Sequence, residues 1–122
     1  MKAWDRGIAV AMVFFVVLGM AGMAAAQSEE GIANIYNDSL QGKKTSSGEP
    51  YDKNGLTAAH KKLAYGTKVK VTNVANGKSV VVTVNDRLAS SSPAVIDVTR
   101  RAAEELDFVK SGKTKVQLEV VK

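Results

Sequence analysis

The sequence has 122 residues, of which 45% are hydrophobic, the size and composition of a single globular domain. Its 17 Lys and Arg residues exceed its 12 Asp and Glu residues, and the net charge of +5 suits an anionic polymer as well as it suits a solvated basic surface. Because there is no cysteine, disulfides, thiol catalysis, zinc-thiolate sites and a lipid on an N-terminal Cys are excluded.

Residues 1–26 are predicted to be a signal peptide. Lys2 and Arg6 precede an apolar run over residues 8–26, which ends on the Ala-x-Ala pattern that signal peptidases read. An uncleaved anchor is the alternative, since a run of this length could just span a bilayer. Cleavage after Ala26 would give an exported protein, periplasmic or secreted, without a lipid or a stable membrane anchor.

The remainder is predicted to be a short polar leader over residues 27–30 and one domain over residues 31–122. The first strand is expected in "GIANIY", residues 31–36, followed by a polar loop over residues 37–55 with no helical period. Loops of this length are usually functional or disordered. A short strand, "LTAAH", is predicted over residues 56–60.

A β-hairpin over residues 67–86 is the clearest local pattern. Valines alternate with polar residues on both sides of Asn76-Gly77, and this dipeptide predicts a type I′ turn. Another short strand is predicted over residues 94–98.

The last elements predicted are a helix over residues 100–106, capped by Thr99, and a strand over residues 115–121. Arg100 and Arg101 oppose the helix dipole, so packing must hold this helix. About six short strands and one short helix indicate a mainly β fold, and a small closed barrel is favoured because closure removes exposed sheet edges.

Polar side chains gather at the ends of two predicted strands. His60 ends one of them, Asp86 and Arg87 end another, and Glu49 lies in the long loop. A carboxylate near a histidine, an arginine and a second carboxylate would have its ionisation tuned for acid or base catalysis. Each residue also has a structural explanation, as a local ion pair or turn, a satisfied imidazole or a solvated charge.

Four blocks of sequence occur in the order found in one known family: "GIANIY", "GKKTSSGEPYD", "LTAAHKKLAYGTKVKVTNVANGKSVVVTVNDR" and "VIDVTRRAAEEL". In these blocks the chain resembles the rare lipoprotein A group of septal-ring lytic transglycosylases. The resemblance covers nearly all of residues 31–121. It implies a six-stranded double-psi β-barrel with one short helix, following the signal peptide.

The resemblance implies cleavage of the β-1,4 bond between N-acetylmuramic acid and N-acetylglucosamine, with 1,6-anhydro ends as the product. The family's candidate catalytic residues correspond to Glu49, His60 and Asp86, and we expect Asp86 to act as general acid and base. Because the attacking hydroxyl belongs to the substrate, no metal or cofactor is expected.

Other residues are expected to assist. Arg87, Tyr51, Lys44 and Asn85 are predicted to bind substrate, and Asp97 corresponds to a second aspartate of the family that could be auxiliary. The expected partner is peptidoglycan glycan stripped of its peptides, together with division-site proteins. A monomer is expected. Binding of nucleic acid is not expected, because the basic residues are scattered.

Two departures from the family keep an alternative open. Ile35 replaces a usual Trp, and Leu88 replaces a usual Gly after the Asn-Asp-Arg motif. A non-catalytic, wall-loosening barrel similar to expansins is therefore the second interpretation. A third is a β-1,4-glycan hydrolase that uses Glu49 and Asp86 as its carboxylate pair.

Overall fold

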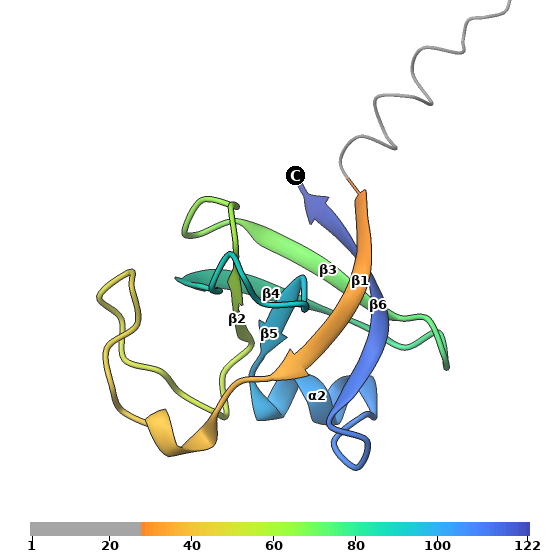
Figure 1. Ribbon diagram of the computed structural model, residues 1–122, viewed down its shortest axis with the longest axis horizontal. Helices are drawn as coiled ribbons and strands as arrows, with labels where there is room; N and C mark the ends of the chain where they lie inside the picture. Colours follow the sequence, from red (N-terminus) through yellow and green to blue (C-terminus); the bar gives the residue numbers. More distant parts are fainter. Residues whose placement is uncertain (1–27) are drawn as a thin grey trace, which may run out of the picture.

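The computed structural model describes residues 28–122, and the predicted signal peptide lies outside them. Six strands form a closed barrel in the order β1-β5-β2-β4-β3-β6 (Figure 1). The strands are β1 Ser28–Ile35, β2 Thr57–His60, β3 Lys68–Asn73, β4 Ser79–Arg87, β5 Ile96–Val98 and β6 Lys113–Val121, joined by the 3-10 helix η2 Asp38–Leu40 and the helix α2 Arg100–Leu106. Within residues 28–122, no helix is long and apolar enough to cross a membrane.

Each strand has two neighbours, which confirms the predicted mainly β barrel. Strand β1 runs parallel to β5 and antiparallel to β6, while β2 runs parallel to β4 and antiparallel to β5. Among the described residues, this arrangement leaves no edge of the barrel unpaired. Alternate residues of the strands fill the interior, as shown by the fully buried Val82 and Val84 of β4.

Strand β1 begins earlier than the sequence pattern predicts. Ser28, Glu29 and Glu30, expected as a polar leader, continue the ladder with residues 117–119 of β6. Their side chains are exposed, so the apolar alternation that marks a strand is missing there. The pairing comes from backbone hydrogen bonds, which side-chain polarity does not reveal.

The hairpin between β3 and β4 forms as predicted, but the prediction of a type I′ turn is wrong. Gly77 has φ +79°, whereas Asn76 does not have the positive φ that a type I′ turn requires. The loop has four residues instead, and Asn73 closes it by donating to the carbonyl of Lys78 at 2.7 Å. The Asn76 side chain donates to the carbonyl of Leu106 at 3.0 Å, so contact with the end of α2 helps to shape the turn.

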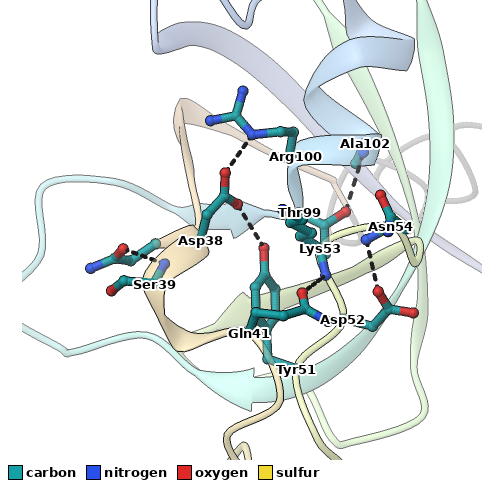
Figure 2. Close-up of polar contacts among 11 residues, drawn as sticks. Asp38, Ser39, Gln41, Tyr51, Asp52, Lys53, Asn54, Thr99, Arg100 and Ala102 are labelled. Atoms are coloured by element: carbon teal, nitrogen blue, oxygen red, sulfur yellow. Dashed lines mark hydrogen bonds and ion pairs between the residues drawn. The ribbon is translucent and has the colours of Figure 1, made fainter.

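Helix α2 has the predicted bounds and the predicted cap. The Thr99 hydroxyl accepts a hydrogen bond from the backbone of Ala102 at 3.2 Å and donates to the carbonyl of Gly55 at 2.6 Å. Arg100 pairs with Asp38 of η2 (Figure 2). These contacts fasten the long loop to the helix from both of its ends.

Candidate active site

A bulge between β2 and β4 determines where Asp86 points. Ala58 pairs with Val84, but the next residue, Ala59, pairs with Asp86 because Asn85 is an extra residue in β4. If Asn85 were paired as in a regular strand, the two-residue period would turn Asp86 toward the core, on the same face as Val84. The bulge turns the carboxylate to the outer face of the barrel, which is a common device next to active sites.

Four hydrogen bonds hold the Asp86 carboxylate. Oδ1 accepts from the backbone N–H of Ser46 at 2.9 Å, from its hydroxyl at 2.7 Å and from the backbone N–H of Arg87 at 2.8 Å. Oδ2 accepts from the hydroxyl of Tyr36. Burial raises the pKa of Asp86, but the hydrogen bonds from Tyr36, Ser46 and Arg87 outweigh it and leave the pKa below its ordinary value. The carboxylate is therefore held ionised.

The ring of Tyr36 is held in place by a second tyrosine. Its ring stacks on that of Tyr51, with ring centres 4.2 Å apart, and the Tyr51 hydroxyl donates to Asp38 at 3.5 Å. Figure 2 shows Asp38 between Tyr51 and Arg100 of α2. Burial and then Asp38 raise the pKa of Tyr51 to about 12, and burial and the bond to Asp86 raise that of Tyr36. Both phenols therefore remain neutral donors at ordinary pH.

Asp86 lines a pocket of about 300 Å³. The other residues that line it include Tyr36, Arg87, Leu88 and Asp97. Asp97 lies on β5 opposite Ala59, so this small residue separates the two aspartates. The Oδ1 atom of Asp97 is buried and has no hydrogen-bond partner among residues 28–122. Burial and the charge of Asp86 raise the pKa of Asp97.

His60 lies on the other face of β2. Its Nδ1 accepts hydrogen bonds from the backbone of Lys62 and Leu63 at 3.0 and 3.1 Å, and its Nε2 lies 2.9 Å from a carboxylate oxygen of Glu29. Since Nδ1 is an acceptor, the ring proton is on Nε2. His60 is 4% exposed and lines a separate cavity of about 590 Å³ at the barrel end. It makes no direct contact with Asp86 in the part of the chain that the structure describes.

Glu49 approaches the site through a neighbour of Asp86. Its carboxylate accepts a 3.4 Å hydrogen bond from the amide of Asn85, and both residues line a third pocket, of about 270 Å³. Glu49, His60 and Asp86 thus surround the end of β4 but line three different pockets. Their side chains do not join in one cluster.

The residues expected to bind substrate divide into exposed and buried ones. Lys44 and Arg87 are exposed, and the Arg87 guanidinium lies 4.4 Å from the ring centre of Tyr65. Asn85 is 6% exposed, and its side-chain amide donates a hydrogen bond to Glu49. Tyr51 differs most from expectation: it is 2% exposed and packs behind Tyr36, so its ring has no face available for a sugar.

Sequence reasoning missed Ser46 and Tyr36 as partners of Asp86. They lie 40 and 50 residues before it in the chain, and no local pattern joins them to it. The only signal is that both fall in the matched blocks, Tyr36 at the end of "GIANIY" and Ser46 in "TSSGE". Within residues 28–122, no group of three or more His, Cys, Asp or Glu side chains could hold a metal ion.

Comparisons with solved structures agree with the barrel. A Streptomyces papain inhibitor superposes with a TM-score of 0.64 at 22% identity, covering 79% of this chain and 96% of that one. The expansin of Clavibacter michiganensis gives 0.63 at 21% identity, covering 78% of this chain and 50% of that one. At these identities the likeness concerns the fold alone.

Comparisons of sequence are more specific. Residues 28–118 match the family model described as lytic transglycolase. The endolytic peptidoglycan transglycosylase RlpA of Campylobacter jejuni is 44% identical over 99 residues, which are 81% of this chain and 36% of that protein. The protein of the same name from Neisseria meningitidis serogroup A is 46% identical over 94 residues, 77% of this chain and 39% of that one.

The chain thus spans little more than a third of the length of the curated relatives that it matches. The family match nevertheless includes strands β1 to β5, most of β6, the bulge and the residues around Asp86. This chain belongs to the lytic transglycolase family, and its fold is the double-psi β-barrel.

Proposed function

We propose that the protein is a peptidoglycan lytic transglycosylase that cleaves between N-acetylmuramic acid and N-acetylglucosamine and leaves 1,6-anhydro ends. The observation that carries this proposal is an ionised carboxylate, Asp86, held by four hydrogen bonds beside an open pocket in a chain of this family. The relatives are named as endolytic peptidoglycan transglycosylases. Glycan strands without stem peptides are the proposed substrate, in wall remodelling or daughter-cell separation.

The chemistry assigned to Asp86 follows from its ionisation. The 6-hydroxyl of muramic acid attacks its own C1, and the Asp86 carboxylate accepts the proton that this hydroxyl loses. The negative charge also stabilises the positive charge that develops at C1. Asp86 was predicted to act as both general acid and general base. Its four hydrogen-bond donors favour the ionised carboxylate, and this supports the role of base.

His60 and Glu49 are assigned positioning roles. The His60 ring fixes the turn after β2, and its carbonyl accepts hydrogen bonds from the backbone of Leu88 at 3.2 Å and from Arg87 at 3.3 Å. These bonds hold the segment that follows Asp86. Glu49 holds the amide of Asn85, the extra residue of the bulge. Both residues would therefore affect catalysis through the orientation of Asp86.

Substrate attraction and cellular context complete the proposal. The exposed Lys44 and Arg87 would attract the lactyl carboxylates that stripped glycan retains. We propose an exported monomer, periplasmic or secreted, that meets its substrate in the wall and works with proteins of the division site.

A glycan-binding barrel without activity is the second candidate. Leu88 lines the pocket beside Asp86, where the resemblance leads us to expect a glycine. A leucine side chain fills more of this pocket than a glycine would, and it would therefore hinder a glycan from reaching the carboxylate. In this case the protein would bind stripped glycan without cleaving it.

Mass spectrometry of the products separates these candidates. Peptidoglycan stripped by an amidase would be incubated with the wild-type protein, with Asp86→Asn, and with the control Glu104→Gln on the exposed face of α2. Anhydro-terminated fragments from the wild type and the control, with none from Asp86→Asn, are expected. Retained binding without fragments from any variant would establish the binding barrel, and reducing ends without the anhydro bridge would indicate a hydrolase.

A further inference from the structure

The proposed base leaves the other half of the reaction without an assigned residue. The leaving oxygen of N-acetylglucosamine needs a proton, and the four donors around Asp86 make it a poor source of one. A second carboxyl group faces the same pocket. Asp97 on β5 and Asp86 on β4 both lie beside Ala59 of β2, which separates them.

The register sets the spacing of the two aspartates. Neighbouring strands are about 4.8 Å apart, so the backbones of Asp86 and Asp97 are about 10 Å apart across β2. Both side chains lie on the outer face with Ala59 and reach into one pocket. Ala59 lines the same pocket and carries only a methyl group, so it places no bulky side chain between the two carboxyl groups.

The surroundings of the two carboxyl groups differ. Asp86 accepts four hydrogen bonds, whereas the buried Oδ1 of Asp97 has no partner in residues 28–122. The titratable groups around this pocket are Asp86, Tyr36 and Arg87, and the phenol of Tyr36 is already used by Asp86. A buried oxygen without a donor, near a negative charge, is better accommodated as part of a neutral carboxylic acid.

We propose that Asp97 is the general acid that protonates the leaving oxygen while Asp86 acts as the base. This inference rests on the proposed function. As the bond from C1 to the glycosidic oxygen breaks, its electron pair stays on that oxygen, which takes the proton of Asp97. A lone pair of the 6-hydroxyl forms the new bond to C1, and its proton passes to Asp86. The pair is reset when solvent returns a proton to Asp97 and removes one from Asp86.

Two substrates with different leaving groups test the acid role. Stripped glycan needs a proton on its leaving oxygen, whereas a 4-nitrophenyl glycoside of a GlcNAc–MurNAc disaccharide releases a stable phenolate without one. We expect Asp97→Asn to cleave glycan at least about 100-fold more slowly than the wild type. The same variant should cleave the nitrophenyl glycoside within a few-fold of the wild-type rate, while Asp86→Asn should be impaired on both substrates.

An equal loss on both substrates by Asp97→Asn would overturn the acid role and leave Asp97 as a structural residue. A wild-type protein that cleaves neither substrate would instead overturn the proposed function. Carboxyl ¹³C NMR of the wild type gives a readout that needs no cleavage. Titration of Asp97 at a higher pH than Asp86, with a lower midpoint for Asp97 in Asp86→Asn, supports the paired arrangement; titration of Asp97 at or below Asp86 overturns it.

Discussion

The two faces of strand β2 give neighbouring residues different surroundings. On the outer face, Ala59 separates Asp86 from Asp97 beside an open pocket. One residue further on, His60 turns to the other face, where the backbone N–H groups of Lys62 and Leu63 and the carboxylate of Glu29 hold the imidazole. The outer face carries the two carboxyl groups to which we assign proton exchange with a substrate, whereas the inner face carries a ring with both nitrogens engaged.

Residues that are adjacent in the chain therefore need not belong to the same site. A strand separates consecutive side chains onto opposite faces, and a single bulge in the partner strand decides which of its residues join them. The bulge at Asn85 therefore matters more to the site than the separation in sequence between Asp86 and His60 does. Variants that disturb one face at a time test this difference.

Insertion of one alanine between Ala58 and Ala59 should have the largest effect. The inserted residue would pair with Asn85 and abolish the bulge, so that the two-residue period turns Asp86 into the core, where a charge has no partner, and the free energy of unfolding should fall by more than about 3 kcal/mol. Urea unfolding followed by circular dichroism measures this loss. Asn85→Ala is the matched control, because it keeps the bulge and removes only the contact with Glu49, a loss of about 1 kcal/mol. Equal losses in the two variants would show that the bulge does not control the face.

Tyr36→Phe should be next, with a loss of about 2 kcal/mol at pH 7, since it removes a hydrogen bond to a charged group. The pKa of Asp86 is lowered in the folded state, so its hydrogen bonds stabilise the protein above its unfolded pKa and cease to do so as pH falls through the folded value. The difference from the wild type should therefore shrink below about pH 4. Tyr65→Phe, with its 42% exposed ring, is the control. An equal loss at both pH values would indicate packing alone.

Asp97→Asn should have a smaller effect of the opposite sign, a gain of about 1 kcal/mol at pH 7. The pKa of Asp97 is raised in the folded state, so wild-type stability falls as pH rises from the unfolded pKa through the folded one. The variant lacks this fall, and its advantage should vanish near pH 3. Unfolding midpoints in urea at the two pH values measure it. A variant less stable than the wild type at pH 7 would contradict the strained environment inferred for this carboxyl group.

Glu29→Gln should have the smallest effect, below about 1 kcal/mol. The Glu29 side chain is 48% exposed, and glutamine keeps an oxygen that can accept from Nε2 of His60. His60→Ala gives the contrast, because it leaves the N–H groups of Lys62 and Leu63 without their acceptor and should cost about 2 kcal/mol. Thermal unfolding compares the two. A larger loss in Glu29→Gln would show that the carboxylate, rather than the backbone, holds the ring.

The parts of the fold that depend on local pattern were predictable. Helix α2 was predicted with its bounds because a capping threonine and an apolar face are encoded within a few residues. The β3–β4 hairpin followed from alternating valines, the closed barrel was favoured by the number of short strands, and its double-psi form was implied by the family resemblance. The predicted type of the turn at Asn76 was wrong because the carbonyl of Leu106, thirty residues away, takes part in shaping this turn.

The candidate site was predictable in its central residue and not in its contacts. Asp86 stands in a recognisable motif, but its donors come from the fold of a loop that has no periodic pattern. Tyr36 and Tyr51 look alike in the sequence, and only packing decides that one reaches Asp86 while the other lies buried behind it. The bulge that separates His60 from Asp86 also lacks a local signature, since it is a shift in register between β2 and β4 that neither strand shows by itself.

The pairing of β1 with β6 also has a consequence for folding kinetics. This ladder joins residues roughly ninety positions apart, as in the pairing of Ser28 with Glu119. Closing so large a loop costs chain entropy before any contact compensates for it, whereas the β3–β4 hairpin forms from neighbouring segments. The barrel should therefore fold slowly and acquire its closing seam late, and until then β1 presents an unpaired edge that could join another chain.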